Sequence, residues 1–155
     1  MSDDGLLAEV LRGEAELATD AMRAFHAEVG AGAYRRAVSS AYYTAFHAVR
    51  LLLAASGFEA HTHDGVQALL HAHFIRPGAL PTQVAKDFGA LRFQRSAADY
   101  DASVPVDRES VREAEERTMG VLAGVVEQLR QRRVDPVDLS EFLTTARKFG
   151  QPSGR

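Results

Sequence analysis

The clearest pattern of apolar and polar positions lies between Tyr34 and Leu53, where the chain reads YRRAVSSAYYTAFHAVRLLL. This stretch contains neither Gly nor Pro, and it is long enough for more than about five helical turns. Apolar residues recur along it with the spacing of one helix face, at Val38, Tyr42, Ala45, Val49 and Leu52. The pattern therefore predicts a long central helix that packs in the core. Small residues on it predict close approach of a neighbouring helix, at Ala37, Ala41 and Ala48.

The same spacing predicts further helices on both sides of this stretch. They are expected at residues 4–29, for about three turns after residues 61–64, from Thr82 to a loop or helix end after Arg95, at residues 108–133, and in a short helix that begins at Asp135. No segment has the alternation of a strand. We therefore expect an all-α fold, an antiparallel up-and-down bundle of five to six helices. Residues 1–134 would form the bundle, and residues 135–155 a short extra helix with a flexible tail.

Helix ends and buried faces can also be predicted. Residues that commonly cap helices precede several segments, namely Ser2 or Asp3, the segment 61–64, Thr82 and Asp107, and glycines follow the first and the central helix, at Gly30, Gly32 and Gly57. The first helix is expected to bury an apolar stripe of Leu7, Val10, Leu11, Leu17, Ala18, Ala21 and Phe25. The last helix has an apolar edge of Leu139, Phe142 and Leu143.

Composition narrows the possible functions. The 155 residues include no Cys, which excludes disulfides and thiolate zinc sites. The N-terminus is acidic and lacks the basic and then apolar order of a signal peptide, and no apolar run approaches the roughly 20 residues that span a bilayer. We therefore expect a cytoplasmic protein. The net charge of −3 argues against a generally basic nucleic-acid-binding surface but leaves room for a local one.

The polar face of the central helix has an unusual charge. Its residues are cationic or hydrogen-bonding, and no carboxylate lies among Arg36, Ser40, Tyr43, His47 and Arg50. A solvated helix face commonly mixes both signs of charge. Two readings stay open: the face binds an anionic ligand, or its charges pair with acids of the first or fifth helix.

The histidines do not favour a metal site. His61 and His63, like His71 and His73, are two residues apart, which points the members of each pair to different sides of a helix. We therefore expect no metal. His63 is better placed as a cap or as a phosphate-facing residue at a helix start.

Three segments in order resemble one known family. They are RRAVSSAYYTAFHAVRLLL with its YY-x-x-F pattern, THDGV at a helix start, and LRFQRSAADYD with its R-x-x-x-D-Y pattern. Together they resemble the small stand-alone prokaryotic branch of the HEPN superfamily, the higher eukaryotes and prokaryotes nucleotide-binding domains. The resemblance covers about Leu6 to Arg133 and leaves out the segment from Asp135. It implies a helical bundle, usually a homodimer, that binds RNA or a nucleotide, and we expect no cofactor.

Many members of that family are metal-independent ribonucleases, and this sequence departs from their motif. The motif has an Arg, four to six residues, a His and, often, a Tyr two residues later. Aligned with it, Arg92 and Tyr100 match, but Ala98 stands at the His position. His would move a proton, and Arg would stabilise the phosphorane charge. The standard nuclease site is therefore expected to be absent.

A non-standard ribonuclease site is an alternative. Its catalytic candidates are Arg92, Arg95 and Asp99, and the substitute proton acceptor would be Asp99, His47 or His63. These residues also have a structural explanation, because Arg95 and Asp99 are four residues apart and can form an ion pair on one helix face. Tyr100 could likewise anchor a loop through a packed ring and a bonded hydroxyl.

The leading hypothesis is a groove that binds RNA or a nucleotide. Its residues would come from the central helix, the next helix start and the R-x-x-x-D-Y segment, and they are Arg36, Tyr43, His47, Arg50, His63, Arg92, Arg95 and Tyr100. Arg would hold phosphates, and Tyr would stack on a base.

A second hypothesis follows from the family resemblance. Members are commonly encoded beside a minimal nucleotidyltransferase, as toxin and antitoxin, so the chain would be a partner-binding subunit. On this hypothesis the apolar edge of the last helix and the Ala-rich face of the central helix contact the partner or a second copy. Tyr100 would then offer its hydroxyl to the partner enzyme.

Overall fold

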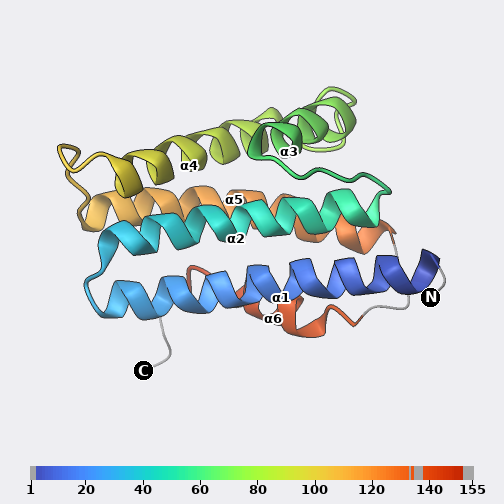
Figure 1. The fold of residues 1–155 in the computed structure, drawn as a ribbon, viewed down its shortest axis with the longest axis horizontal. Coiled ribbons are helices and arrows are strands. Elements are labelled where there is room, and N and C mark those ends of the chain that lie inside the picture. The colour runs from blue at the N-terminus through green and yellow to red at the C-terminus, as the bar shows by residue number, and fades with distance from the viewer. Residues whose placement is uncertain (1–2, 133, 135–137, 152–155) are drawn as a thin grey trace.

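The computed structural model describes residues 3–132, 134 and 138–151, and the regular structure of these residues is entirely helical. Figure 1 shows the long helices lying side by side. They are α1 (Asp3–Gly30), α2 (Tyr34–Ala55), α3 (His63–Leu70) continued by the π-helical turn η1 (His71–Ile75), α4 (Thr82–Tyr100), α5 (Arg108–Arg132) and α6 (Ser140–Lys148). The expected all-α bundle is confirmed.

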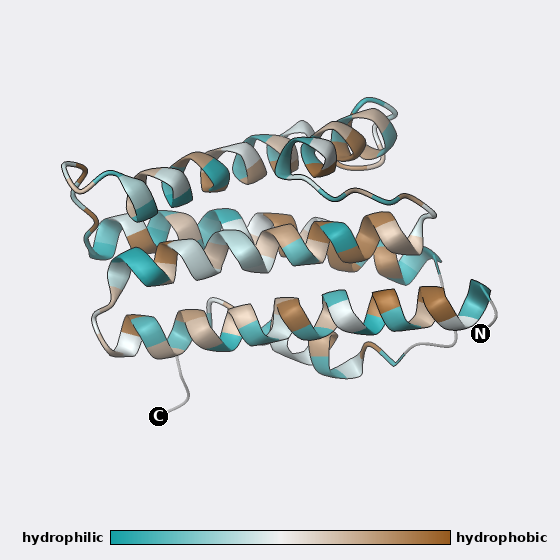
Figure 2. Cartoon of the chain, in the orientation of Figure 1, coloured by the Kyte–Doolittle hydropathy of each residue, from teal (hydrophilic) through white to brown (hydrophobic). Residues whose placement is uncertain are grey.

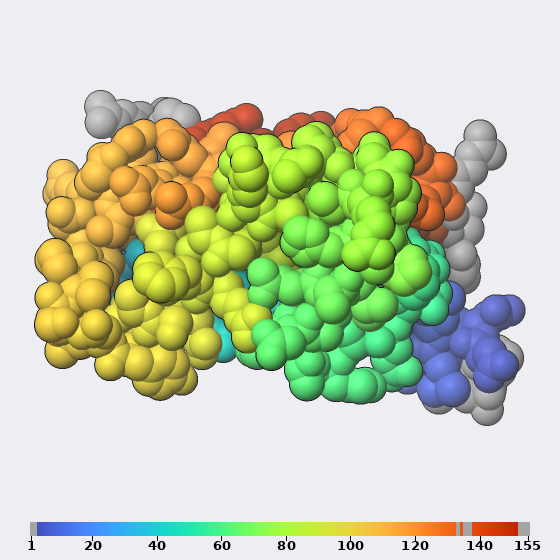
Figure 3. All heavy atoms as spheres, turned by 90° about the horizontal axis from the view of Figure 1, so that it is seen from above, coloured from blue at the N-terminus to red at the C-terminus, as the bar shows by residue number. Residues whose placement is uncertain are grey.

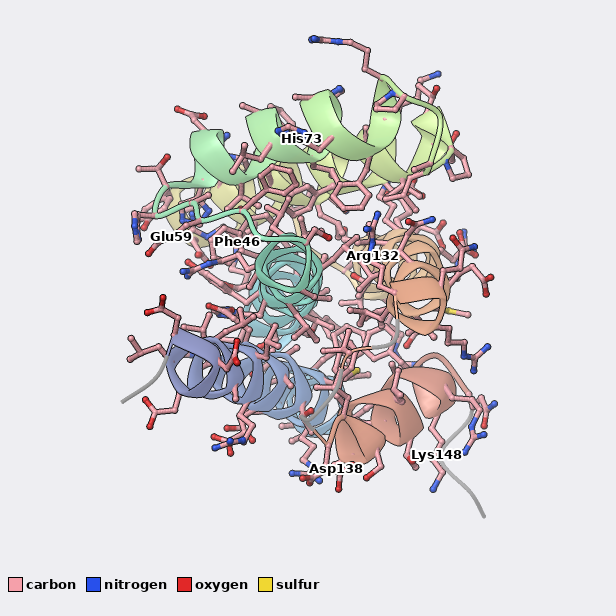
Figure 4. The ribbon with its side chains drawn as sticks, turned by 90° about the vertical axis from the view of Figure 1, so that its right-hand side faces the viewer. Phe46, Glu59, His73, Arg132, Asp138 and Lys148 are labelled. Carbon is pink, nitrogen blue, oxygen red and sulfur yellow. The ribbon has the colours of Figure 1, made fainter. Side chains whose placement is uncertain are left out.

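The central position of α2 follows from its buried face. Viewed end-on in Figure 4, α2 lies among α1, α5 and the layer formed by α3 and α4. Ala37, Ala41 and Ala48 are fully buried. The hydroxyl of Thr118 on α5 donates to the backbone carbonyl of Ala41 at 3.2 Å. The small residues therefore allow close helix packing, as the sequence predicts.

The predicted core face of α1 is partly wrong. Leu11 and Phe25 are buried, but Leu7, Val10 and Leu17 are 42%, 50% and 48% exposed. The reason is that α2 and α6 cover only one side of α1. The apolar stripe is wider than the face that these neighbours cover, so part of it lies on the surface.

α6 packs against α1 and contributes to the same core. Leu139 and Phe142 are buried, and Leu143 is half-buried against the core. Phe149, just after α6, packs on Phe25 of α1 with ring centroids 5.1 Å apart. The chain itself covers Leu139 and Phe142, so these two residues are not available for the expected partner contact, and a contact through Leu143 stays a prediction.

The helix ends agree with most of the predicted signals. Gly32 and Gly57 follow α1 and α2 with φ of 73° and 86°, the left-handed conformation that glycine adopts without strain. Asp107 caps α5, since its Oδ1 accepts the backbone N–H of Ser110 at 2.9 Å. α4 continues through the ADY segment, so Tyr100 lies in its last turn.

Two predicted caps are wrong. Thr82 is the first residue of α4 and makes no side-chain cap bond, because Pro81 occupies the N-cap position. At α3 the cap is Thr62, whose hydroxyl accepts the N–H of Gly65 at 2.9 Å, and not His63. Asp3 is already helical, while Ser2 and the predicted helix start at Asp135 lie outside the described residues. The domain division between residues 134 and 135 stays a prediction.

Candidate functional site

Planar side chains stack where α2 faces the last turns of α4. The guanidinium of Arg95 lies over the rings of Tyr43 and Tyr100, with Cζ 5.3 Å and 5.5 Å from the two ring centroids. The ring of His47, one turn along α2, stacks on Tyr43 with centroids 6.2 Å apart. Cation–π attraction holds the guanidinium between these elements. We call Tyr43, Arg95 and Tyr100 the Arg–Tyr stack.

Arg95 retains free hydrogen-bond donors. Its Nε lies 3.0 Å from Oδ2 of Asp99, so the expected i,i+4 ion pair is present. The N–H does not align with that oxygen, however, and buried Nε has no hydrogen-bond acceptor among the described residues. The hydroxyl of Ser39 donates to the same carboxylate at 3.3 Å. Buried Nε is out of reach of a ligand, so a ligand oxygen would bind the Nη groups of Arg95, which make no hydrogen bond to a described residue.

A hollow of about 530 Å³ lies beside the stack. The end of α1, the first turns of α2 and the end of α4 form its walls, through Glu28, Arg35, Arg36, Ser39, Ser40, Ala98, Asp99 and Tyr100. The carboxylate of Glu28 accepts the Ser40 hydroxyl at 2.8 Å. Arg36 is exposed and makes no hydrogen bond or ion pair with any described residue. The hollow therefore contains an uncommitted cation next to Tyr100, which is 76% exposed.

Arg35 fixes the end of α4. Its guanidinium donates to the backbone carbonyls of Ala98 at 2.9 Å and Asp101 at 3.2 Å, and it also reaches those of Ala102 and Val104. A cation favours the negative end of a helix dipole, and the planar guanidinium can serve several acceptors at once. Arg35 thereby holds the turn that carries Tyr100. Arg35 is not among the residues predicted from the sequence, although its position three residues before Val38, on the flank of the apolar face, is a signal that it faces the protein.

His63 is held by a buried tyrosine. The hydroxyl of Tyr42 lies 2.5 Å from Nδ1 of His63, whose ring stacks on Phe46 with centroids 4.6 Å apart. Burial raises the pKa of Tyr42 to about 12, so the phenol stays protonated. Burial, together with Arg92 and Arg95, lowers the pKa of His63. The neutral form of His63 is therefore favoured, with Nδ1 engaged by the phenol of Tyr42.

His47 and Arg50 contact α1 instead of the hollow. Both face Glu14, which is only 7% exposed: Nδ1 of His47 lies 2.8 Å from one carboxylate oxygen and Nε of Arg50 3.3 Å from the other. A buried carboxylate requires such partners. For His47 and Arg50 the structure therefore agrees with the alternative interpretation, in which the charged face of the central helix pairs with acids of the first helix.

Arg92 connects α4 to α3. Its Nη1 donates to Oδ1 of Asp64 and to Oε1 of Gln67, both at 2.6 Å. Figure 3 looks onto the face formed by α3 and α4, where α2 is visible only in small patches beside α4.

The contacts of the eight predicted binding residues divide them into three groups. They are Arg36, Tyr43, Arg95 and Tyr100 at or beside the hollow, His47 and Arg50 toward α1, and His63 and Arg92 toward α3.

The described residues contain no group of three or more His, Cys, Asp or Glu side chains placed to hold a metal ion. No helix in this part of the chain is long and apolar enough to cross a membrane.

Comparison with known proteins gives a family match and several relatives. The family model of the HEPN domain matches residues 9–149. A UPF0332 protein of Thermotoga maritima is 28% identical over 89 residues, which are 57% of this chain and 67% of that protein. The "Putative toxin MJ0142" of Methanocaldococcus jannaschii is 30% identical over 76 residues, 49% of this chain and 52% of that protein. The UPF0332 protein PH1297 of Pyrococcus horikoshii is 36% identical over 55 residues, 36% of this chain and 39% of that protein.

The matched regions define how far the likeness extends. The aligned part spans about two thirds of the Thermotoga protein, about half of the Methanocaldococcus protein and less of the Pyrococcus protein. The family match ends at residue 149 and so includes α6. The expected end of the resemblance at Arg133 is therefore too early.

Proposed function

Because the chain belongs to the HEPN domain family, we propose that it is a module that binds single-stranded RNA or a nucleotide at the hollow beside Tyr100. The observation that carries this proposal is the Arg95 guanidinium, which lies over two tyrosine rings beside a hollow lined by Arg36, a cation without a partner among the described residues. The name of the Methanocaldococcus relative supports a toxin-like module.

The hollow offers two complementary kinds of contact. Arg36 and Arg95 can donate to phosphate oxygens, for which the forked guanidinium is well suited. Tyr100 is 76% exposed and can stack on a base. A base inside a duplex has both faces covered by its neighbours, so stacking of this kind requires an unpaired base. The chemistry therefore favours single strands or free nucleotides.

We propose binding in preference to cleavage because each candidate proton acceptor is already paired within the protein. The His position of the family's nuclease motif is Ala98, a buried residue with no proton to exchange. Each substitute considered from the sequence is paired with a protein group: Asp99, in the wall of the hollow, with Arg95 and Ser39, His47 with Glu14, and His63 with Tyr42. A non-standard ribonuclease remains the alternative that the following experiment distinguishes.

The test uses purified protein and a labelled single-stranded RNA in EDTA, analysed on a native gel for binding and on a denaturing gel for cleavage. We expect a salt-sensitive shift that Arg36→Ala and Arg95→Ala each weaken about tenfold, with unchanged helical circular dichroism. The matched control is Arg130→Ala on α5, which removes the same charge from an exposed position.

Two results would count against this function. Equal binding by the wild type and both variants would place the RNA elsewhere on the protein. Cleavage in EDTA that disappears in Arg95→Ala would make the protein a metal-independent ribonuclease.

A second candidate function rests on the exposure of Tyr100. Its ring is 76% exposed, and its hydroxyl has no hydrogen-bond partner among the described residues. Such a hydroxyl is accessible to an enzyme, which supports the hypothesis that a minimal nucleotidyltransferase transfers to it the nucleotidyl group of a nucleoside triphosphate, with loss of the hydroxyl proton and release of pyrophosphate. The test is co-expression with a nucleotidyltransferase encoded beside this chain, followed by mass spectrometry. A mass increase that persists in Tyr100→Phe would exclude Tyr100 as the acceptor.

The homodimeric state and the cytoplasmic location stay predictions. Sedimentation equilibrium of the full chain would test the first, and fractionation of cells that express it would test the second.

A further inference from the structure

The N-terminal half of α1 leaves an apolar stripe uncovered. Leu6, Val10 and Leu17 are 48%, 50% and 48% exposed, and they share one helix face with Gly13. Phe58, in the connection from α2 to α3, lines a hollow of about 250 Å³ together with Val10, Gly13 and Leu17. Figure 2 shows hydrophobic positions along this half of α1. Apolar side chains gathered on a surface in this way mark an interaction site. We call this surface the α1 groove.

Gly13 has no explanation within the described fold. A Cβ there would meet no atom within 4 Å, and its φ is not in the left-handed region. The helical glycines of α5 differ: a Cβ at Gly120 would lie 2.7 Å from Oδ2 of Asp87, and one at Gly124 would lie 3.1 Å from Cδ2 of Leu80. Glycine destabilises a helix interior, so Gly13 has a cost that no close neighbour offsets. Within an apolar stripe, it would let the backbone of another molecule approach closely.

Carboxylates border the α1 groove. Glu9, Glu16 and Asp20 are exposed and form no ion pair with any described residue. Glu59, labelled in Figure 4, lines the α1 groove, and its side chain is 82% exposed. Arg12 is the cation of this half of α1, and Arg50, which also lines the α1 groove, is paired with buried Glu14. The border therefore attracts positive charge.

We propose that the α1 groove binds an amphipathic helix of another protein, with an apolar stripe flanked by Lys and Arg. An amphipathic helix laid into an apolar groove is a common mode of recognition, and basic flanks would complement the acidic border. A second copy of this chain fits less well, because a two-fold contact would set Glu9, Glu16 and Asp20 against the same residues. This proposal does not depend on the proposed binding of RNA.

The test uses two labelled synthetic helical peptides with the same leucine stripe, one flanked by Lys and the other by Glu. Fluorescence anisotropy measures their binding to the full chain and to Leu17→Gln and Gly13→Ala. Leu17 is exposed, so its substitution should leave the fold intact. Gly13→Ala should raise the Tm by roughly 2–4 °C while blocking close approach. The matched control is Met119→Gln on α5, which changes a 41% exposed apolar residue outside the α1 groove.

We expect the Lys-flanked peptide to bind, and both variants to weaken it about tenfold while the control does not. The Glu-flanked peptide should bind about tenfold more weakly than the Lys-flanked one. The RNA shift should be unchanged in Leu17→Gln, which separates this test from that of the proposed function. Equal binding of the two peptides, or no binding of the Lys-flanked one, would overturn the proposal. A homodimer that Leu17→Gln dissociates would also overturn it, because a second copy would then occupy the groove.

Discussion

Adjacent residues on α2 have different tasks because roughly 100° of helix rotation separates their side chains. Arg35 donates to backbone carbonyls at the end of α4, whereas Arg36 faces the hollow without a partner among the described residues. Tyr42 is fully buried, whereas Tyr43 lies under the guanidinium of Arg95. Single-residue substitutions should therefore separate structural effects from effects on ligand binding.

The Tyr42–His63 hydrogen bond should make stability depend on pH. In the folded protein the pKa of His63 is lowered from its ordinary value of 6.5, which applies to the unfolded chain. Between the folded and the unfolded pKa, the unfolded chain therefore binds more protons than the folded one. The stability contributed by neutral His63 is fully present above the pKa of the unfolded chain, and it is lost as the pH falls through the pKa of the folded protein. We expect the Tm of the wild type to fall more steeply below about pH 6.5 than that of His63→Gln. Parallel curves would contradict this, and exposed His71→Gln is the control.

Tyr42→Phe tests the direction of the same hydrogen bond. The substitution keeps the buried ring but removes the hydroxyl that hydrogen-bonds Nδ1 of His63. We infer that this hydroxyl is the donor. We expect a loss of about 1 kcal/mol in the free energy of unfolding, measured by urea denaturation. The pKa of His63, followed by NMR, should rise because Nδ1 becomes free to accept a proton. An unchanged pKa would mean that the phenol does not control the tautomer.

At the scale of helices, Arg35 holds the end of α4 from α2. Arg35→Lys keeps the charge but replaces a planar fork with a single ammonium, which cannot serve the same set of carbonyls. We expect weaker RNA binding with unchanged helical circular dichroism, and faster hydrogen exchange at the amide of Val104, which donates to Asp101. Normal RNA affinity despite faster hydrogen exchange at Val104 would show that RNA binding does not depend on the position of Tyr100.

The attachment of α6 can be tested through Phe142. This side chain is 1% exposed, so Phe142→Ala should cost about 3–5 kcal/mol in the free energy of unfolding, because it leaves a cavity in the core. Leu143→Ala, at a half-buried position, should cost less. Equal and small losses for both would indicate that α6 is dispensable for the fold.

Helical spacing predicts much of this architecture, because each helix buries a face and several ends carry recognisable caps. It cannot say which neighbour covers an apolar face. Val10 and Leu17 on α1 follow the same period as buried Leu11, and only the position of α2 and α6 leaves them exposed. For the same reason the charged face of α2 divides. Arg50 reaches Glu14, thirty-six residues earlier in the chain, while Arg36 remains unpaired in the described part.

At the scale of the whole molecule, the two candidate surfaces lie toward opposite ends of the bundle. The hollow is formed by the end of α1, the start of α2 and the end of α4, which meet at one end in Figure 1. The α1 groove is formed by the start of α1 and the end of α2, toward the other end. The two surfaces also differ in charge, although the net charge of the whole chain is only −3. RNA and a protein partner could therefore be bound at the same time.

The most direct test of the account is the salt dependence of binding to a single-stranded RNA. The affinity of the wild type should fall linearly on a plot of log K against log salt, since cations at the hollow replace condensed counterions. Arg36→Ala should reduce the magnitude of this slope by about 0.7, the value for one phosphate contact on a single strand. Arg130→Ala should leave it unchanged. Identical slopes for Arg36→Ala and the wild type, or no binding even at low salt, would contradict a binding site at the hollow.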